Sequence, residues 1–530
     1  MRTVNRWIAA IVVSITFTSC AIAQAPKPTG VSEPLDAYVE RALKTFEVPG
    51  MAVAVVKGGK VVYAKGFGVR RLGSPDKVDA NTLFQIGSTT KAMTVAALAT
   101  LVDQGKLKWD GPVRDYMPSF QMYDSYVSKE ITVRDLLTHR SGLGMGEGDL
   151  LLFPPSNLTR PQLIARMKNI KPLWSFRTHW AYCNLCFVTA GELIPAITGK
   201  SWEDYVQSNL FKPLGMNDTR VTVAGLKPTD NIASAHEIVD GKVTIVPWDV
   251  IDNAAPAGAV VSSVNDMSKW IAVQLSHGKL PNGQLLFTEA DSREMWSGVS
   301  LRPLRPTTPG FELLHKNFNE YALGWGVWDY RGQKIIEHSG GVTGMITEVV
   351  LVPGMDLGLV LFANTPANNE LAVPAVMYRV LDEYMGANLE DWTSKFKVTQ
   401  QKMLQDDANE QKKASSARDA DSKPSLAIEK YAGEYSDPWF GEAKLTMENG
   451  KLVFSVPWSP RLTGDVEHWQ HDTFVIHFRD KTVPDSYLYF SMNPDNSIER
   501  AKMAPVSALA DFSYDFQDLE LKPIEKPTTK

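Results

Sequence analysis

The sequence predicts a mixed α/β protein in which one antiparallel sheet is flanked by helices and interrupted by an inserted, mostly helical region. A small C-terminal antiparallel β-barrel or sandwich is predicted to follow. Strand-like runs occur at both ends of the first 386 residues, helical periodicity fills the middle, and period-two alternation returns after residue 426. A length of 530 residues with 44% hydrophobic content is enough for two or three domains.

The first domain is predicted to span residues 24–386. Its middle contains helical patterns separated by Pro- and Gly-rich loops, while strand-like runs lie near both of its ends. We expect these strands to join in one antiparallel sheet and to leave a cleft between sheet and helices for a small molecule. The predicted helices are 35–46, a helix after Ser88, and segments around 133–138, 160–168, 183–197, 202–208, 265–276 and 371–384; the predicted strands are 51–56, 60–69, 334–337, 347–352 and 357–363.

Composition changes after this domain. Residues 387–425 are rich in Lys, Asp, Gln, Ser and Ala, which predicts a charged, partly helical linker. Residues 426–530 alternate as strands do, and Asn449-Gly450 between two such runs is a strong hairpin signal. Histidines and aromatic residues between 468 and 477 are interpreted as one face of a sheet, and not as a metal site.

The N-terminus has the pattern of an export signal. Arg2 and Arg6 precede a largely apolar stretch that ends at Ala21-Ile22-Ala23, so residues 1–23 are predicted to be a signal peptide of an exported, periplasmic or secreted protein. The stretch is too short for a transmembrane span, and a lipid anchor at Cys20 is left open as an alternative. A net charge of −5 without a basic stripe argues against a nucleic-acid partner.

Beyond Cys20, the chain contains only Cys183 and Cys186. A zinc site would need two further ligands, and no other cysteine is available. A redox role of the Cys-x-x-Cys pair is left open as an alternative, although the expected thioredoxin-like βαβ context is absent. Both residues are interpreted as small apolar fillers at the start of a helix, and disulfides are not expected to hold the protein together.

The strongest functional signal is Ser88-Thr89-Thr90-Lys91, which begins a helical apolar pattern. A serine hydroxyl needs a neighbouring base to act as a nucleophile, and a lysine three residues later on a helix lies on the same face. Burial would push this lysine toward its neutral form, and the helix N-terminus favours negative charge on the hydroxyl. Two other Ser-x-x-Lys sequences, starting at Ser74 and Ser394, are interpreted as a turn and as part of the charged stretch.

Two further segments carry candidate site residues. Tyr182 and Asn184 precede a predicted helix: the phenol can act as a base if a lysine charge lowers its pKa, and the amide can bind both a substrate carbonyl and Lys91. His338, Gly340 and Gly341 lie on a predicted strand whose glycines let a substrate backbone approach the edge. The backbone N–H of Gly341 and that of Ser88 can form an oxyanion hole. Taken alone, the tyrosine is better explained as a residue that caps a core, and the histidine can be explained as a structural residue of the strand.

In this order, Ser-Thr-Thr-Lys, Tyr-Cys-Asn and His-Ser-Gly resemble the three active-site elements of the class C β-lactamase and penicillin-binding-protein-like serine hydrolases. The resemblance covers roughly residues 33–385, with supporting stretches at 136–143 and 256–267, and residues 431–489 look like the accessory β domain that often follows. It implies a β-lactamase-like fold and acyl-enzyme chemistry without metal or cofactor. It also implies that Ser88 is the nucleophile, that Tyr182 deprotonates it, and that Lys91 holds Tyr182 basic. In the same comparison Asn184, His338, Gly340 and Gly341 contact the substrate or its oxyanion.

The chain departs from the family pattern at His338, where β-lactamases and many cell-wall peptidases have lysine. A neutral imidazole binds a carboxylate less firmly, so the change points toward the related esterases and D-amino-acid-directed peptidases. Cys183 replaces a common serine without affecting an assigned role. The predicted function is hydrolysis of an ester or peptide-like amide, including small unusual peptides that contain D-amino acids or resemble linear microcystin. The alternatives are a β-lactamase or D-alanyl-D-alanine carboxypeptidase, and a non-catalytic penicillin- or peptidoglycan-binding protein; the oligomeric state is open.

Overall fold

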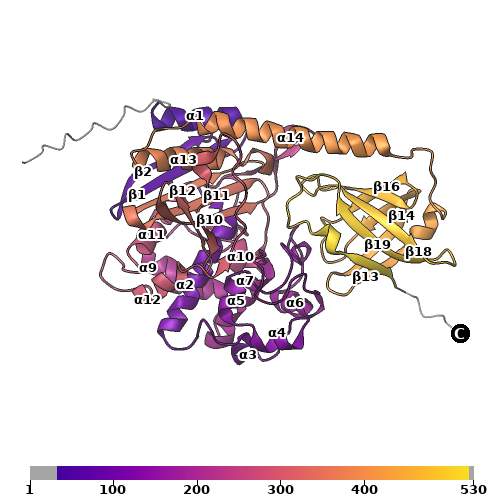
Figure 1. Ribbon diagram of the computed structural model, residues 1–530, viewed down its shortest axis with the longest axis horizontal. Coiled ribbons are helices and arrows are strands. Elements are labelled where there is room, and N and C mark those ends of the chain that lie inside the picture. The colour runs from indigo at the N-terminus through magenta and orange to yellow at the C-terminus, as the bar shows by residue number, and fades with distance from the viewer. Residues whose placement is uncertain (1–32, 525–530) are drawn as a thin grey trace, which may run out of the picture.

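The computed structural model describes residues 33–524 (Figure 1). The predicted signal peptide and Cys20 therefore lie outside the described residues. Within the described range, no helix combines the length and the apolar character needed to cross a bilayer.

The two ends of the first domain form one antiparallel sheet, as predicted. The strand order is β2-β1-β12-β11-β10-β9-β8-β7, so the N-terminal hairpin lies beside the strands that close the domain. Three strands at one edge were not predicted, because they have five residues or fewer and show too little alternation. The strands are β1 (Gly50–Lys57), β2 (Lys60–Gly68), β7 (Ser300–Leu301), β8 (Asn319–Tyr321), β9 (Gly326–Tyr330), β10 (Gln333–Val342), β11 (Met345–Val352) and β12 (Leu357–Ala363).

Helices cover both faces of this sheet. On one face, α1 (Leu35–Phe46) and α13 (Ala372–Tyr384) pack on alternate residues of β1, including Val53 and Val55. The other residues of β1, such as Ala54, face the core that contains α2 (Thr90–Asp103) and α11 (Val264–Leu275). Because both faces are buried, β1 is apolar at nearly every position.

The inserted region is mostly helical, as predicted, and lies on the α2 side of the sheet (Figure 1). Two short strand pairs occur within or beside it. Its elements are α3 (Val113–Tyr116), α4 (Ser125–Glu130), α5 (Val133–Leu137), α6 (Arg160–Arg166), α7 (Asn184–Thr198), α8 (Trp202–Val206), α9 (Lys212–Leu214), α10 (Ala255–Gly258), α12 (Glu289–Met295), β3 (Phe84–Gln85) with β6 (Val261–Ser262), and β4 (Ala235–Val239) with β5 (Lys242–Val246).

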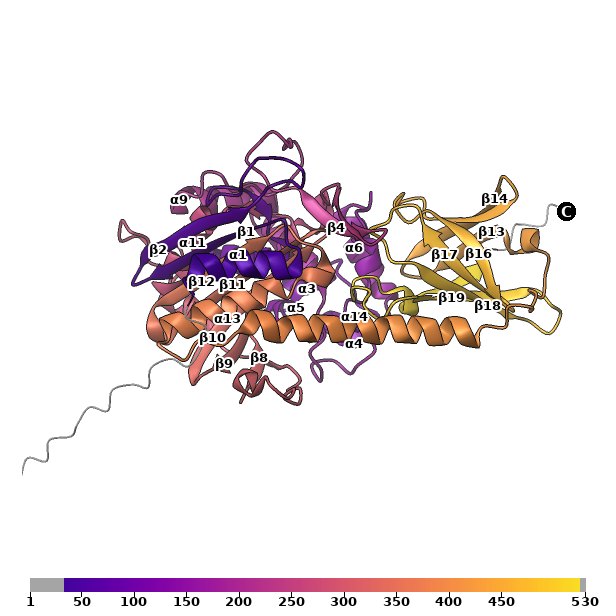
Figure 2. The same cartoon turned by 90° about the horizontal axis from the view of Figure 1, so that it is seen from above.

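One long helix, α14 (Trp392–Ala417), occupies most of the predicted linker. It begins against α1 and α13 and runs from the first domain to the C-terminal barrel (Figures 1 and 2). Its Lys, Gln and Ala residues are good helix formers, and beyond its first turns it is largely exposed. The predicted domain boundaries stay a prediction.

The C-terminal domain is a closed antiparallel barrel of eight strands. Aromatic side chains such as Phe474, Phe478 and Phe490 fill its interior. Its strands are β13 (Gly433–Asp437), β14 (Gly441–Glu448), β15 (Lys451–Ser455), β16 (Gly464–Gln470), β17 (Thr473–Phe478), β18 (Ser486–Met492), β19 (Ile498–Pro505) and β20 (Glu520–Pro523).

The barrel contacts the first domain at several points. Asn169 Nδ2 donates a hydrogen bond to Pro438 O at 2.8 Å, and Arg461 forms an ion pair with Asp249 at 2.6 Å. The loop between β19 and β20, residues 506–519, also reaches the first domain. We call this segment the barrel loop.

Candidate active site

Ser88 lies on a turn at the start of a buried helix. The short 3₁₀ turn η1 (Gly87–Thr89) leads directly into α2, which is buried on nearly every side. Gly87 has a φ of 52°, and a Cβ at this position would lie 2.8 Å from Gly341 N, so glycine is required. Ser88 itself is only partly buried, and the helix dipole favours negative charge at its position.

Lys91 is fully buried, and its amine contacts three oxygen atoms. Nζ lies 3.0 Å from Ser88 Oγ, 2.7 Å from Asn184 Oδ1 and 2.8 Å from Ala257 O. Burial lowers the pKa of Lys91 to about 7, while the charge of Asp149 opposes the shift. A neutral amine has two N–H donors and one lone pair. It can therefore donate to the two carbonyl oxygens and accept the proton of the Ser88 hydroxyl.

Tyr182 reaches the same hydroxyl. Its side chain hydrogen-bonds Ser88, and Lys91 Nζ lies 4.7 Å from the centroid of its ring. Burial raises the pKa of Tyr182 above its ordinary value, and the charge of Asp149 adds to the rise, while the hydrogen bond to Ser88 opposes it. The raised pKa favours a protonated phenol near neutral pH over the expected tyrosinate, because burial outweighs the effect that was expected from a lysine charge.

Asn184 connects Lys91 to a buried acid that the sequence did not reveal. Its Oδ1 accepts from Lys91, and its Nδ2 donates to Asp149 Oδ2 at 2.8 Å. Burial raises the pKa of Asp149 to about 7, although hydrogen bonds from Asn184 and Ser513 and the charge of Lys91 oppose the rise. Lys91 and Asp149 therefore titrate in the same pH range and interact, so their protonation belongs to the pair.

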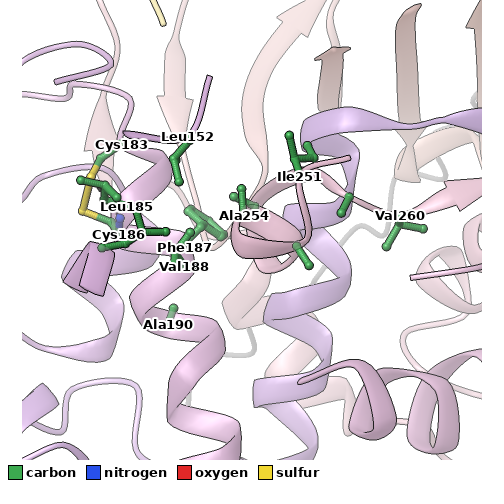
Figure 3. Packing of buried hydrophobic residues seen from close by; sticks show 14 of the residues in the cluster. Leu152, Cys183, Leu185, Cys186, Phe187, Val188, Ala190, Ile251, Ala254 and Val260 are labelled. Carbon is green, nitrogen blue, oxygen red and sulfur yellow. Dashed lines mark hydrogen bonds between the residues drawn. A yellow bond between two sulfur atoms is a disulfide. The ribbon is translucent and has the colours of Figure 1, made fainter. Parts of the chain in front are cut away.

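A disulfide between Cys183 and Cys186 lies at the start of α7 (Figure 3). The expectation of two unlinked apolar fillers is wrong. Both side chains are buried, but the residue that precedes α7 and the third residue of the helix have Cα atoms 5.4 Å apart, a distance that a disulfide spans. The bond includes the residue between Tyr182 and Asn184 in a closed ring with the first turn of α7.

His139 holds the backbone on both sides of Tyr182. Its carbonyl accepts from Ala181 N at 2.9 Å, and its Nδ1 accepts from Cys183 N at 3.0 Å. The imidazole also lies against the Tyr182 ring, with 4.3 Å between ring centroids. Burial keeps the pKa of His139 well below its ordinary value, so the ring is neutral and can accept this hydrogen bond.

His338 is brought to the site but has no free ring nitrogen. Nδ1 donates to Ser339 O at 2.6 Å, so Nε2 accepts from the Tyr321 hydroxyl at 2.8 Å. Burial lowers the pKa of His338 to about 4, and the Lys91 charge adds to the shift. The neutral imidazole, with both nitrogens hydrogen-bonded, lines the site beside Tyr182 and does not present a positive charge to a substrate.

The glycines of β10 let the strand pack closely on the Ser88 turn. A Cβ at Gly340 would lie 2.1 Å from Ile86 O, and Gly341 N lies beside Gly87. β10 pairs with β9 only as far as Glu337, so within residues 33–524 no strand covers this edge of β10 from residue 338 to 342. The Gly341 backbone is thus exposed next to the nucleophile.

The site as a whole combines a serine hydroxyl, a buried lysine whose pKa is about 7, and a neutral tyrosine at one point. A serine hydroxyl beside a lysine with a lowered pKa is an arrangement typical of a serine hydrolase. The chain belongs to the Beta-lactamase family, whose profile matches residues 35–382. Residues 417–523 match a second profile, described as Domain of unknown function (DUF3471).

Known proteins are similar to this chain over most of its length. A protein named "Unguisins hydrolase ungD'" from Aspergillus campestris is 30% identical over 433 residues, which are 77% of each chain. Penicillin-binding protein 4 from Amycolatopsis lactamdurans is 26% identical over 61% of this chain and 83% of its own. The octameric penicillin-binding protein homologue from Pyrococcus abyssi has a similar fold, with a TM-score of 0.58 at 19% identity over 89% of this chain and 97% of its own.

The structure brings together all seven predicted site residues. It adds Asp149, His139, Tyr321 and Ser513, for which the sequence predicted no role. His139 lay in a stretch that supported the family resemblance, but Asp149 follows Gly146-Glu147-Gly148 in a loop with no recognisable pattern. Ser513 is more than 300 residues from Asp149, so local spacing carries no signal for this contact.

Proposed function

We propose that this serine hydrolase works through an acyl-enzyme, with Lys91 as the base that activates Ser88. The observation that carries the proposal is the contact of 3.0 Å between Lys91 Nζ and Ser88 Oγ, in a site that lowers the pKa of the lysine to about 7. Near neutral pH the amine accepts the hydroxyl proton as Oγ attacks a carbonyl carbon, and a tetrahedral oxyanion forms.

The other residues then have distinct roles. The neutral Tyr182 hydroxyl, which is hydrogen-bonded to Ser88, donates its proton to the leaving oxygen or nitrogen. Tyr182 is then reprotonated with the proton that Lys91 took from Ser88. The backbone N–H groups of Ser88 and Gly341 bind the oxyanion. Asn184 uses one amide N–H for Asp149, and its second N–H is available for a substrate carbonyl. Water then releases the acyl group by the reverse proton transfers.

We propose a small peptide-like amide or an ester as the substrate. The exposed backbone of β10 beside Gly341 suits an extended main chain, and a relative that covers most of this chain is named for the hydrolysis of unguisins. D-amino-acid-containing and linear microcystin-like peptides belong to this substrate class. Both ring nitrogens of His338 are hydrogen-bonded, and no lysine occupies this position to bind a substrate carboxylate. This arrangement favours a peptide-like amide or an ester over a β-lactam or a D-alanyl-D-alanine terminus. Because one relative is named as a penicillin-binding protein, the test also covers those alternatives and a non-catalytic binding role.

A substrate panel with a covalent trap tests the proposal. The panel contains p-nitrophenyl esters, D- and L-amino-acid amides, short linear peptides and a chromogenic cephalosporin, each assayed with the wild type and with Ser88→Ala. We expect turnover of esters or peptide amides, a mass increase on Ser88 from a slow substrate, and loss of both in Ser88→Ala. Turnover by Ser88→Ala at the wild-type rate would refute the mechanism. Turnover of the cephalosporin alone would replace the proposed substrate class by β-lactams, and acylation of Ser88 without turnover would replace it by a binding role.

A further inference from the structure

The barrel loop reaches the hydrogen-bonded chain that ends at the catalytic lysine. Ser513 Oγ donates to Asp149 Oδ2 at 3.0 Å. The same carboxylate oxygen accepts from Asn184 Nδ2, and the Oδ1 of that amide accepts from Lys91. A residue of the C-terminal domain is therefore linked to Lys91 through only two intervening side chains.

A second residue of the barrel loop holds the backbone around Asp149. Asp515 Oδ2 accepts from Gly148 N at 2.6 Å, and Asp515 Oδ1 accepts from Leu150 N at 2.9 Å. These N–H groups lie immediately before and after Asp149, at the start of a 3₁₀ turn where no partner within the turn exists for them. Asp515 is itself fully buried, so this contact belongs to the packed interior of the interface between the two domains.

A third residue of the barrel loop lies against Tyr182. The ring of Phe512 meets that of Tyr182 edge-on, with 5.8 Å between centroids. Phe512 also packs on Gly146, where a Cβ would lie 2.7 Å from Phe512 Cδ2, and Gly146 N donates to Tyr182 O at 2.8 Å. Three residues of one barrel loop thus meet the segment 146–150 and the catalytic tyrosine.

The position of Asp149 depends on these contacts. Its Oδ2 receives donors from both domains, while its Oδ1 has no hydrogen-bond partner among the described side chains and backbone. Loss of the Ser513 hydroxyl would leave Asn184 as the one side-chain donor to the carboxyl group. A misplaced amide would in turn move its Oδ1 away from Lys91 Nζ, and small displacements of catalytic groups reduce rates strongly.

We propose that the barrel loop completes the active site, with Ser513 as a positioning residue that holds Asp149, and through it Asn184 and Lys91, in the catalytic arrangement. The proposal rests on the proposed function, since it requires Lys91 to be the base for Ser88. It gives the C-terminal domain a direct part in the chemistry of the first domain.

The charge of Asp149 provides a readout that a purely structural role would not move. The titratable groups that interact with Asp149 are Lys91 from α2, Tyr182 from the segment before α7, and Asp511 and Asp515 from the barrel loop. The Ser513 hydrogen bond favours the charged form of Asp149, so its loss raises the pKa of Asp149. The charge of Asp149 raises the pKa of Lys91, so a less charged Asp149 lowers that pKa. Lys91 then becomes neutral at a lower pH, and the acidic limb of the kcat/KM profile moves to lower pH.

The test compares three serine variants of the full-length protein, with thermal unfolding to check that each is folded. Ser513→Ala removes the hydroxyl, Ser513→Thr keeps it, and Ser507→Ala is the matched control, because Ser507 lies in the same loop but donates to Asp407 on α14. We expect Ser513→Ala to lower kcat about tenfold with little change in KM and to shift the acidic limb to lower pH. Ser513→Thr should restore both values, and Ser507→Ala should behave as wild type.

Two results would overturn the inference. One is wild-type kcat and an unshifted pH profile in Ser513→Ala. The other is an equal loss in Ser513→Ala and Ser507→Ala, which would indicate loosening of the whole loop. Asp149→Asn keeps the size of the side chain and removes its charge, so the proposal expects its acidic limb to shift in the same direction even if Ser513→Ala is unstable. Failure of the proposed function is recognised separately, because Ser88→Ala would then remain active.

Discussion

Two of the polar contacts between the barrel and the first domain differ in the residues that lie behind them. At the barrel loop, Ser513 contacts Asp149, whose hydrogen bonds lead to the catalytic lysine. At the other contact, Arg461 pairs with Asp249, which otherwise accepts from the Thr343 backbone at the tip of β10. Both contacts involve a buried carboxylate of the first domain, but the carboxylate of Asp149 is linked by hydrogen bonds through Asn184 to Lys91, whereas that of Asp249 is not. Burial of an interdomain contact therefore says little about its role, and the groups one step further along decide it.

Tyr182→Phe should have the largest effect and sets the scale for a residue that touches the nucleophile. The variant keeps the ring that packs on His139 and Phe512 but removes the hydroxyl that bonds Ser88. We expect kcat/KM to fall at least about 10²-fold, the usual scale for an acid–base group. A fall smaller than that of Ser513→Ala, measured with the same substrate, would remove Tyr182 from the proton transfers.

Arg461→Ala should have the smallest effect on activity and sharpens the comparison from the other side. Arg461 binds Asp249 and Asp480, and its loss leaves Asp249 buried without its ion-pair partner. We expect the free energy of unfolding to fall by about 2 kcal/mol, as for a lost hydrogen bond to a charged group. At 25 °C, kcat/KM should stay within about threefold of wild type, since the hydrogen bonds of the Asp249 carboxylate lead to the β10–β11 turn and not to Lys91, Tyr182 or Asn184.

Denaturant unfolding and steady-state kinetics on the same Arg461→Ala preparation show whether the variant loses stability, activity or both. A loss of kcat comparable to that of Ser513→Ala, with a shifted acidic limb, would show that the two contacts do not differ. The comparison between them would then fail, while the assignment of Ser88 and Lys91 would be unaffected.

The sequence predicted the parts of the site that are local. Ser88 and Lys91 are one helical turn apart, so their spacing indicated a shared helix face. Tyr182 and Asn184 are two residues apart at the start of a helix, and the family resemblance gave them their roles. The antiparallel sheet followed from strand patterns at both ends of the domain. The contact between Asp149 and Ser513 could not be predicted, because it depends on how a barrel loop docks on a different domain.

Electrostatics were predicted only in part. The lowered pKa of Lys91 followed from its predicted place at the start of a mostly buried helix, and the structure agrees. The rise in the pKa of Tyr182 could not be read from the sequence, since it depends on how deeply the folded chain buries the phenol. The disulfide at Cys183 was missed because an apolar context is equally suitable for free thiols.

The pH dependence of kcat/KM tests the central claim most directly, namely that a buried, neutral Lys91 activates Ser88. The amine accepts a proton only when it is neutral, so activity should rise with pH through a midpoint of about 7 and then level off. A lysine with its ordinary pKa of 10.5 would instead give a midpoint more than three pH units higher. Asp149→Asn should move this midpoint to lower pH, because it removes the charge that raises the pKa of Lys91. A rising limb near pH 10, or a midpoint near 7 that does not move in Asp149→Asn, would contradict the account.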